Sequence, residues 1–216
     1  MSADRFRVVV LISGRGSNLQ AIIDQTLSGD LPIEMACVIS NRPNAQGLER
    51  AAKAGIETAA VDHTQFSDRQ AFESALIAEI DRHQPQLVVL AGFMRVLSAE
   101  FVRHYANRMI NIHPSLLPAF PGLHTHERAI EANAAQHGAS VHFVTPEVDA
   151  GPIIIQATVP IKTNDTPELL AARVLEQEHH IYPLAVRWLA ENRLSIENNQ
   201  VLLDGRRQKE QGLQGD

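Results

Sequence analysis

The sequence predicts an α/β protein whose sheet is mostly parallel and twisted, with helices on both faces. Short apolar segments alternate with longer segments whose apolar residues recur at helical spacing. Alternating β and α units of this kind form parallel sheets. Hydrophobic residues make up 44% of the 216 residues, so the chain can bury a substantial core, and this length favours one domain over two.

Each element is expected where the residue pattern changes. Strands are predicted at residues 6–12, 33–40, 58–61, 87–92, 109–112, 139–145 and 153–161. The apolar runs at 6–12 and 87–92 are expected to be buried strands. Helices are predicted at residues 18–27, 45–54, 67–83, 98–105, 127–136 and from 165 onward. Pro183 is expected to kink or divide the last helix. Alternation around Asn198-Asn199 predicts a small C-terminal hairpin over residues 194–203.

Composition and charge exclude several classes of function. The formal net charge of -6 does not suit a protein that coats nucleic acid or an anionic membrane. Cys37 is the only cysteine, which rules out an intrachain disulfide, and its apolar neighbours predict a buried thiol. No signal peptide and no membrane-spanning apolar run is apparent. We therefore expect a cytoplasmic protein with one domain over residues 1–205 and a polar tail over residues 206–216.

A glycine loop follows the first predicted strand, with the sequence Ser13-Gly14-Arg15-Gly16-Ser17-Asn18. Glycines let backbone N–H groups converge, and the helix N-terminus behind them favours an anion. The loop lacks the Walker lysine, and Leu19 replaces the third glycine of the dinucleotide fingerprint. A phosphate monoester is therefore the expected ligand, although a plain glycine turn capped by Ser17 or Asn18 would give the same pattern.

Asn111 and His113 lie two residues apart at the end of a predicted strand, so both side chains face the same side. An uncharged hydrogen-bond donor beside a group that exchanges protons suits acyl transfer. Asp149, in a tight loop after another strand, would fix the histidine and favour its protonated form. The alternative is that these residues only cap a strand, fill a core gap and form a turn. Ser115 lies in no nucleophile elbow, which favours direct transfer over a covalent intermediate.

The ten histidines do not form a recognised zinc motif, so no metal is expected. Most of them should lie at the surface or support other residues. His142 alternates with apolar residues in a predicted strand, and its side chain could face either the expected site or solvent.

Several of these stretches together resemble the phosphoribosylglycinamide formyltransferases, folate-dependent enzymes of purine synthesis with a Rossmann-like fold. The resemblance runs from about Arg7 to Gly205. The glycine loop and the residues after it, up to Gln20, distinguish this family from the other formyltransferases. The matching stretches are residues 14–20, 90–95, 111–118 and 149–156.

The resemblance implies formyl transfer from 10-formyltetrahydrofolate to the amine of glycinamide ribonucleotide, by an enzyme that is a monomer or homodimer. The implied catalytic residues are Asn111, His113 and Asp149. The implied ribonucleotide-binding residues are Gly16, Ser17, Asn18, Leu19, Gln20 and Glu178, mainly in the N-terminal half. The implied folate-binding residues are Arg69, Met94, Arg95, Val96, Leu97, Asn111, Thr145, Pro146, Glu147, Val148 and Asp149. Two residues depart from the pattern: Arg15 stands where a small or uncharged residue is expected, and Leu175 where a polar substrate contact is common.

Four other functions compete with this one. A methionyl-tRNA formyltransferase is expected to carry a nucleic-acid-binding domain, and a formyltetrahydrofolate hydrolase an N-terminal regulatory domain. A sugar-nucleotide formyltransferase would not need the glycine loop. A non-catalytic module that binds a phosphorylated metabolite would need the loop but not the Asn111, His113 and Asp149 arrangement.

Overall fold

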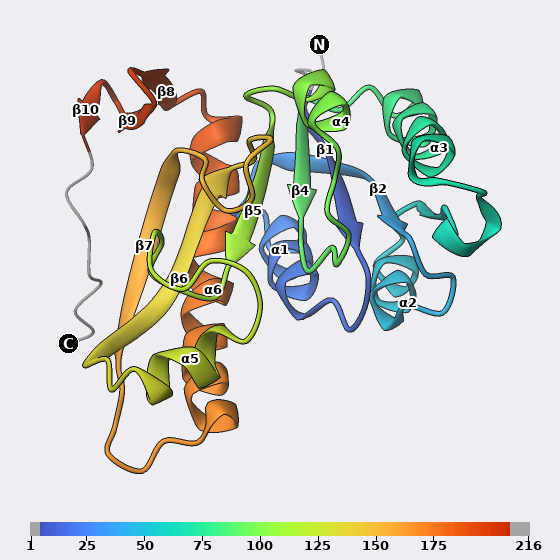
Figure 1. Ribbon diagram of the computed structural model, residues 1–216. Coiled ribbons are helices and arrows are strands. Elements are labelled where there is room, and N and C mark those ends of the chain that lie inside the picture. Colours follow the sequence, from blue (N-terminus) through green and yellow to red (C-terminus); the bar gives the residue numbers. More distant parts are fainter. Residues whose placement is uncertain (1–4, 208–216) are drawn as a thin grey trace. The chain divides into compact units, whose positions relative to one another are not determined.

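A computed structural model describes residues 5–207 of the chain (Figure 1). Contacts between residues divide the chain at Ile110 into two compact units, residues 1–110 and 111–216. The expectation of one domain over residues 1–205 stays a prediction. None of the described helices has the length and apolar composition that a membrane span requires.

Four parallel strands form the centre of the first unit. They are β1 (Phe6–Ile12), β2 (Ile33–Ser40), β3 (Thr58–Ala60) and β4 (Leu87–Leu90). β1 pairs with β2 and with β4, and β2 pairs with β3. Residues 8–12 have no exposed surface, as the uninterrupted apolar run predicts for a strand covered on both faces.

Helices in the first unit begin close to where the sequence predicts. They are α1 (Ser17–Leu27), α2 (Gln46–Lys53), α3 (Arg69–Arg82), α4 (Ala99–His104) and the short 3-10 helix η1 (His63–Gln65). The side chains of Asp68 and Ser98 accept hydrogen bonds from the backbone N–H groups of Ala71 and Phe101. These caps fix the first turns of α3 and α4.

The second unit contains the antiparallel part of the sheet. β5 (Met109–His113) ends in this unit, followed by β6 (Gln136–Phe143) and β7 (Ile153–Pro160), which pair antiparallel. α6 (Pro167–Ala190) contacts β6, β7 and the shorter helix α5 (Thr125–Glu131). The strand order is β3-β2-β1-β4-β5-β6-β7. The predicted mostly parallel sheet with helices is therefore confirmed.

One sequence prediction in the second unit is wrong, and another is wrong in part. The helix expected over residues 127–136 ends at Glu131, because Asn133 adopts a left-handed conformation (φ 49°) that ends a helix. Residues 136–138 join β6 and pair with residues 158–160 of β7. Pro183 does not divide α6, which continues to Ala190, and the kink expected at Pro183 stays a prediction. Neighbouring residues on this part of α6 are buried, and their burial outweighs the hydrogen bond that proline removes.

A separate three-stranded antiparallel sheet confirms the predicted C-terminal hairpin. β8 (Leu194–Glu197) and β9 (Gln200–Leu203) flank Asn198 and Asn199, which both have positive φ, as a type I′ turn requires. β10 (Arg206–Arg207) pairs with β9, so the first two residues of the expected polar tail belong to a strand. Residues 208–216 of that tail lie outside the described part of the chain.

Candidate active site

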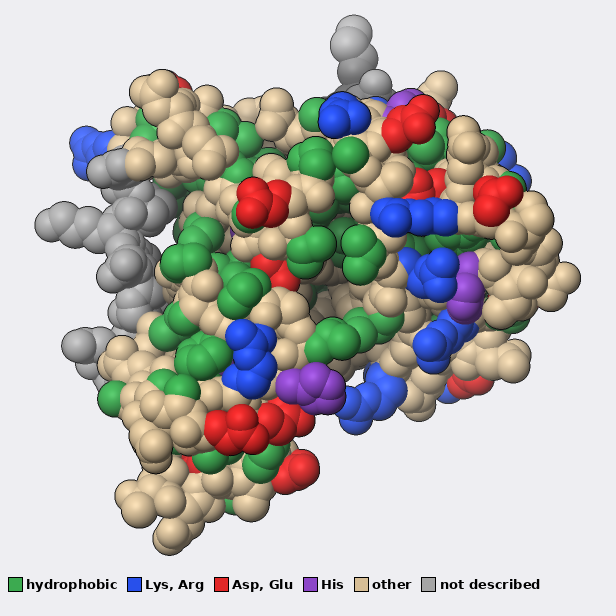
Figure 2. Space-filling view, in the orientation of Figure 1, with side chains coloured by type: hydrophobic (Ala, Val, Ile, Leu, Met, Phe, Trp, Pro, Cys, Tyr) green, Lys and Arg blue, Asp and Glu red, His purple; other side chains and the backbone are tan. Residues whose placement is uncertain are grey.

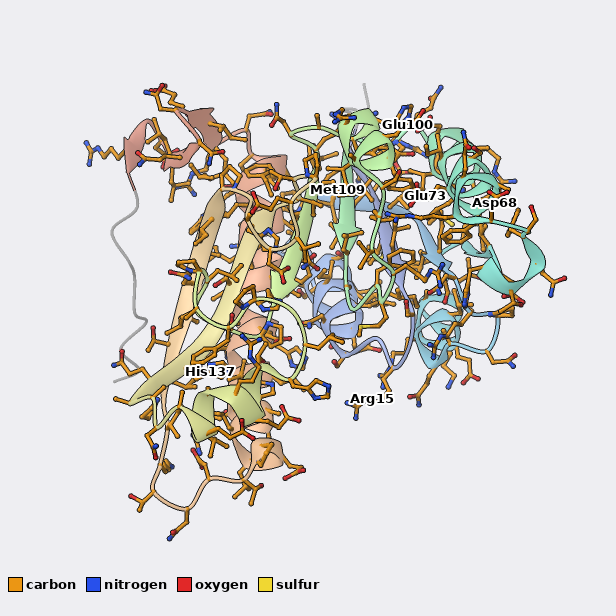
Figure 3. The ribbon with its side chains drawn as sticks, in the orientation of Figure 1. Arg15, Asp68, Glu73, Glu100, Met109 and His137 are labelled. Atoms are coloured by element: carbon orange, nitrogen blue, oxygen red, sulfur yellow. The ribbon has the colours of Figure 1, made fainter. Side chains whose placement is uncertain are left out.

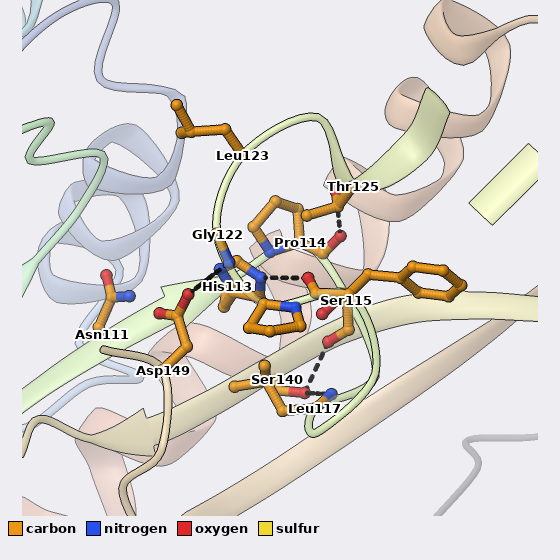
Figure 4. A network of polar contacts seen from close by, with 12 residues as sticks. Asn111, His113, Pro114, Ser115, Leu117, Gly122, Leu123, Thr125, Ser140 and Asp149 are labelled. Atoms are coloured by element: carbon orange, nitrogen blue, oxygen red, sulfur yellow. Dashed lines mark hydrogen bonds and ion pairs between the residues drawn. The ribbon is translucent and has the colours of Figure 1, made fainter. Parts of the chain in front are cut away.

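The end of β5 holds the two residues that the sequence selects as catalytic. Asn111 and His113 occupy alternate positions of the strand Met-Ile-Asn-Ile-His and so face the same side (Figure 4). The side chain of His113 is 7% exposed. Asn111 is half-buried. The end of β5 therefore carries a buried imidazole and a half-buried amide on the same side.

The ring of His113 is held from both sides. Its Nε2 lies 3.0 Å from the carbonyl oxygen of Phe120. Because a carbonyl can only accept, Nε2 must carry a hydrogen and donate it. Nδ1 lies 3.5 Å from Oδ2 of Asp149. This separation is longer than a direct hydrogen bond, so Nδ1 faces the carboxylate without being fully engaged by it.

Asp149 reaches the histidine from the loop between β6 and β7. Its backbone is left-handed, with a φ of 55°, which aspartate tolerates better than most residues. Its Oδ2 accepts a hydrogen bond from the backbone N–H of Gly122 at 2.9 Å. Gly151 lets this loop pass close to β6, since a Cβ there would lie 1.8 Å from the carbonyl oxygen of Phe143. The structure therefore brings Asp149 to His113, as expected.

His142 is a site residue that the sequence leaves undecided. It is 2% exposed, and burial lowers its pKa below the usual value, so its ring is neutral. Nδ1 lies 2.9 Å from the carbonyl oxygen of Phe143 and must donate to it. Nε2 is then an acceptor, and it lies 3.4 Å from Nδ2 of Asn111. His142 thus orients the amide of Asn111, and it lies 3.8 Å from Oδ1 of Asp149.

The loop after β5 is fixed by a network of hydroxyl and amide groups (Figure 4). Ser140 Oγ donates to the carbonyl of Ser115 at 2.6 Å and accepts from the N–H of Leu117 at 3.0 Å. Gln156 Nε2 donates to Ser140 Oγ and to the carbonyl of Leu117. Ser115 Oγ donates to the carbonyl of Ala119 at 2.6 Å. Ser115 is fully buried and serves this network, which agrees with its exclusion as a nucleophile. The Leu117-Pro118 peptide bond is cis.

The glycine loop, residues 13–18 of the first unit, connects β1 to α1. Gly16 is left-handed (φ 73°) at the N-cap position, and no side chain caps α1 among the described residues. Ser13 Oγ donates to Oδ1 of Asn41 and accepts from the N–H of Met94. Arg15 is exposed, and Figure 3 shows its side chain projecting away from the ribbon. Figure 2 shows several Lys and Arg side chains on the part of the surface to the right, with Asp and Glu side chains among them.

Comparison with known proteins settles the family. The sequence matches the family model described as "Formyl transferase" over residues 6–186. The chain belongs to the formyl transferase family.

Relatives of this formyl transferase match along nearly the whole chain. A "Phosphoribosylglycinamide formyltransferase" of Escherichia coli is 52% identical and covers 97% of this chain and 99% of the relative. The structure of the enzyme of that name from Coxiella burnetii is 53% identical, with a TM-score of 0.91 over 97% of this chain and 98% of that chain. A formyltetrahydrofolate deformylase from Pseudomonas syringae is 31% identical, with a TM-score of 0.86 over 94% of this chain and 67% of that chain.

The folate-binding residues expected in the first unit follow β4 or begin α3. Met94 and Val96 are 64% and 67% exposed, which is unusual for large apolar side chains and leaves them available to an apolar ligand. Arg95 lies over the ring of Phe72, 5.7 Å from its centre. Arg69 pairs with the buried carboxylate of Glu73 at 3.0 Å. Glu73 also accepts hydrogen bonds from the N–H and hydroxyl of Ser98, which ties α3 to the start of α4 and fixes Leu97.

The remaining expected contacts of the formyl transferase lie in the second unit. In the loop 145–149, Thr145 Oγ1 donates to the carbonyl of Glu147 at 3.1 Å, and Val148 is 56% exposed. Glu178, expected to bind ribose, is 7% exposed and lies on α6. Leu175 is half-buried on the same helix. Their roles toward substrate stay predictions.

One cluster of possible metal ligands occurs among residues 5–207 of the formyl transferase, formed by Cys37, Glu79 and His83. Glu79 already pairs with Arg82 at 3.0 Å and approaches His83 at 3.4 Å. Burial, with a smaller effect of nearby carboxylates, raises the pKa of the Cys37 thiol to about 12. A protonated thiol beside an already neutralised carboxylate is a poor cation site. The expectation that Cys37 is buried is confirmed.

Proposed function

We propose that this formyl transferase moves the formyl group of 10-formyltetrahydrofolate to the amine of glycinamide ribonucleotide. The observation that carries the proposal is the group Asn111, His113 and Asp149, in which Asp149 faces His113 directly and His142 lies between Asn111 and Asp149. The Escherichia coli relative named for this activity is 52% identical over nearly its whole length. We place the reaction in the cytoplasm, in a monomer or homodimer that needs no nucleic acid.

In the proposed reaction the neutral amine attacks the formyl carbon directly and produces a tetrahedral oxyanion. Asn111 gives one N–H to His142 and keeps a second N–H for the oxyanion. Nε2–H of His113 is taken by Phe120, so Nδ1–H of the imidazolium is the donor that remains for the oxyanion. The carboxylate of Asp149, 3.5 Å away, stabilises that imidazolium.

A proton must then move from the attacking amine to the leaving folate nitrogen. It passes through His113 or through a water molecule near Asp149. Either route leaves the formyl group on the amine and tetrahydrofolate as the second product, without a covalent enzyme intermediate.

Substrate binding is assigned to the residues expected from the resemblance. The glycine loop and Gln20 are proposed to bind the phosphate side of the ribonucleotide, and Glu178 is proposed to bind the ribose. In the first unit, exposed Met94 and Val96 provide apolar surface for the folate. In the second unit, residues 145–149, with exposed Val148, are assigned to its pterin.

Asn111→Ala tests the proposal. Losing one oxyanion donor lowers turnover by about 10²–10³-fold, and we expect this loss in kcat with both substrates saturating. Formyl transfer is measured with glycinamide ribonucleotide and 10-formyltetrahydrofolate. Near-normal turnover would contradict the role of Asn111. Ribonucleotide binding without any turnover by the wild-type protein would favour a binding module, and formate release without acceptor would favour a deformylase.

A further inference from the structure

Helix α2 contacts the glycine loop through its first two turns, at Gly47 and Arg50. We propose that these two residues form a clamp that holds the loop in its anion-binding shape, and that they are positioning residues for recognition of the substrate phosphate. The inference rests on the proposed function, because it assumes that the loop takes a phosphate. All the groups involved belong to the first unit.

Gly47 brings the backbone of α2 against the backbone of the loop. Its N–H donates to the carbonyl of Gly14 at 3.0 Å. A Cβ on Gly47 would lie 2.5 Å from Cδ1 of Ile12 and 3.3 Å from the carbonyl oxygen of Gly14. A Cβ on Gly16 would in turn lie 2.9 Å from Cα of Gly47. The two glycines are therefore required for this close approach.

Arg50 holds the next carbonyl of the loop. Its Nε donates to the carbonyl of Arg15 at 2.8 Å, and its Nη1 donates to Oε1 of Gln20 at 3.2 Å. Both acceptors are uncharged, and Arg50 forms no ion pair with any residue in the range 5–207. Its positive charge therefore adds to the positive end of the α1 dipole beside the loop.

The direction of the two held carbonyls sets the direction of the loop N–H groups. In a trans peptide the C=O of one residue and the N–H of the next point in opposite directions, and these bonds are trans. With the carbonyls of Gly14 and Arg15 turned toward α2, the N–H groups of Arg15 and Gly16 point away from it. Neither N–H donates to a backbone carbonyl in the described part of the chain. The clamp thus leaves two neighbouring backbone donors, both pointing away from α2, for an anion.

The clamp predicts a selective loss of phosphate recognition. Wild-type enzyme is compared with Gly47→Ala and Arg50→Met on two acceptors, glycinamide ribonucleotide and the riboside that lacks the phosphate. We expect KM for the ribonucleotide to rise about ten-fold, as for one or two lost hydrogen bonds. The kcat, the KM for 10-formyltetrahydrofolate and the rate with the riboside should hardly change. Lys53→Met removes an exposed cation from the last turn of α2 and is the matched control.

Four outcomes would overturn the clamp. Equal losses of activity with the ribonucleotide and with the riboside would show a general structural defect. A failure of both variants to fold would show the same. Full rescue by Arg50→Lys would show that charge alone matters at this position, since lysine cannot hold both acceptors. An unchanged ribonucleotide KM in both variants would show that the loop keeps its shape unaided. If the wild-type protein transfers no formyl group to either acceptor, the proposed function fails instead.

Discussion

At the scale of single residues, the tautomer of His142 decides what Asn111 can do. The carbonyl of Phe143 takes Nδ1–H, so the neutral ring presents a lone pair at Nε2. Asn111 must turn its NH2 group toward that lone pair. In the proposed reaction, the second N–H of this amide nitrogen is the donor to the oxyanion.

His142→Leu should therefore lower kcat by about ten-fold, the scale of one hydrogen bond that orients a donor, with KM values nearly unchanged. Steady-state kinetics on both substrates measures the effect. His180→Ala, an exposed histidine on α6, is the control. A wild-type kcat in His142→Leu would show that Asn111 is oriented without it.

His137 makes stability depend on pH. It is 1% exposed, and burial, with a smaller effect of His126, lowers its pKa from 6.5 to about 4. Figure 3 shows it on β6, and the rings of His126 and Phe120 lie against it. The folded state favours the neutral ring. The stability that the neutral His137 ring contributes to the folded state is therefore fully present above pH 6.5, and it is lost as the pH falls through 4.

A pKa lowered from 6.5 to about 4 corresponds to roughly 3 kcal/mol of unfolding free energy lost as the pH falls from 6.5 to 4. Chemical denaturation at several pH values measures this loss. His137→Phe should lose correspondingly less unfolding free energy over this pH range, because the phenylalanine ring has no nitrogen to protonate. If the unfolding free energies of the wild-type protein and His137→Phe fall in parallel with pH, His137 is not the source of the pH dependence.

At the scale of elements, the loop between β6 and β7 depends on one glycine. A Cβ on Gly151 would meet the carbonyl oxygen of Phe143 at 1.8 Å, which is backbone and cannot move aside cheaply. Gly151→Ala should displace the loop and carry Asp149 away from His113. We expect kcat to fall at least ten-fold. Ala150→Ser, at an exposed neighbour, should leave kcat unchanged, and similar kcat values in both variants would show that the loop tolerates the shift.

Helix and strand ends show which local signals the sequence carries. Ser98 and Asp68 are capping residues whose position along the chain is enough to mark the start of a helix. The turn at Asn198-Asn199 is equally local. The sequence of residues 136–138 does not predict a strand, because glutamine, histidine and glycine are not typical of strands. They are extended because β7 supplies the pairing partner.

At the scale of the whole molecule, the glycine loop belongs to one compact unit and Asn111, His113 and Asp149 to the other. The proposed chemical step uses only N–H donors and a carboxylate. Transfer should therefore be unaffected by a strong chelator. The measurement is the rate of formyl transfer before and after dialysis against EDTA. A loss that Zn²⁺ or Mg²⁺ restores would contradict a metal-free mechanism.

The sequence alone determined the alternation of strands and helices, the glycine loop, and the shared face of Asn111 and His113. These are properties of backbone geometry over a few residues. Only the tertiary structure decided that Asp149 reaches His113, that His142 orients Asn111, and that α2 holds the loop through Gly47 and Arg50. Asn111 and His142 are 31 residues apart, and Arg50 and Arg15 are 35. Such contacts depend on how distant segments pack, which no local periodicity encodes.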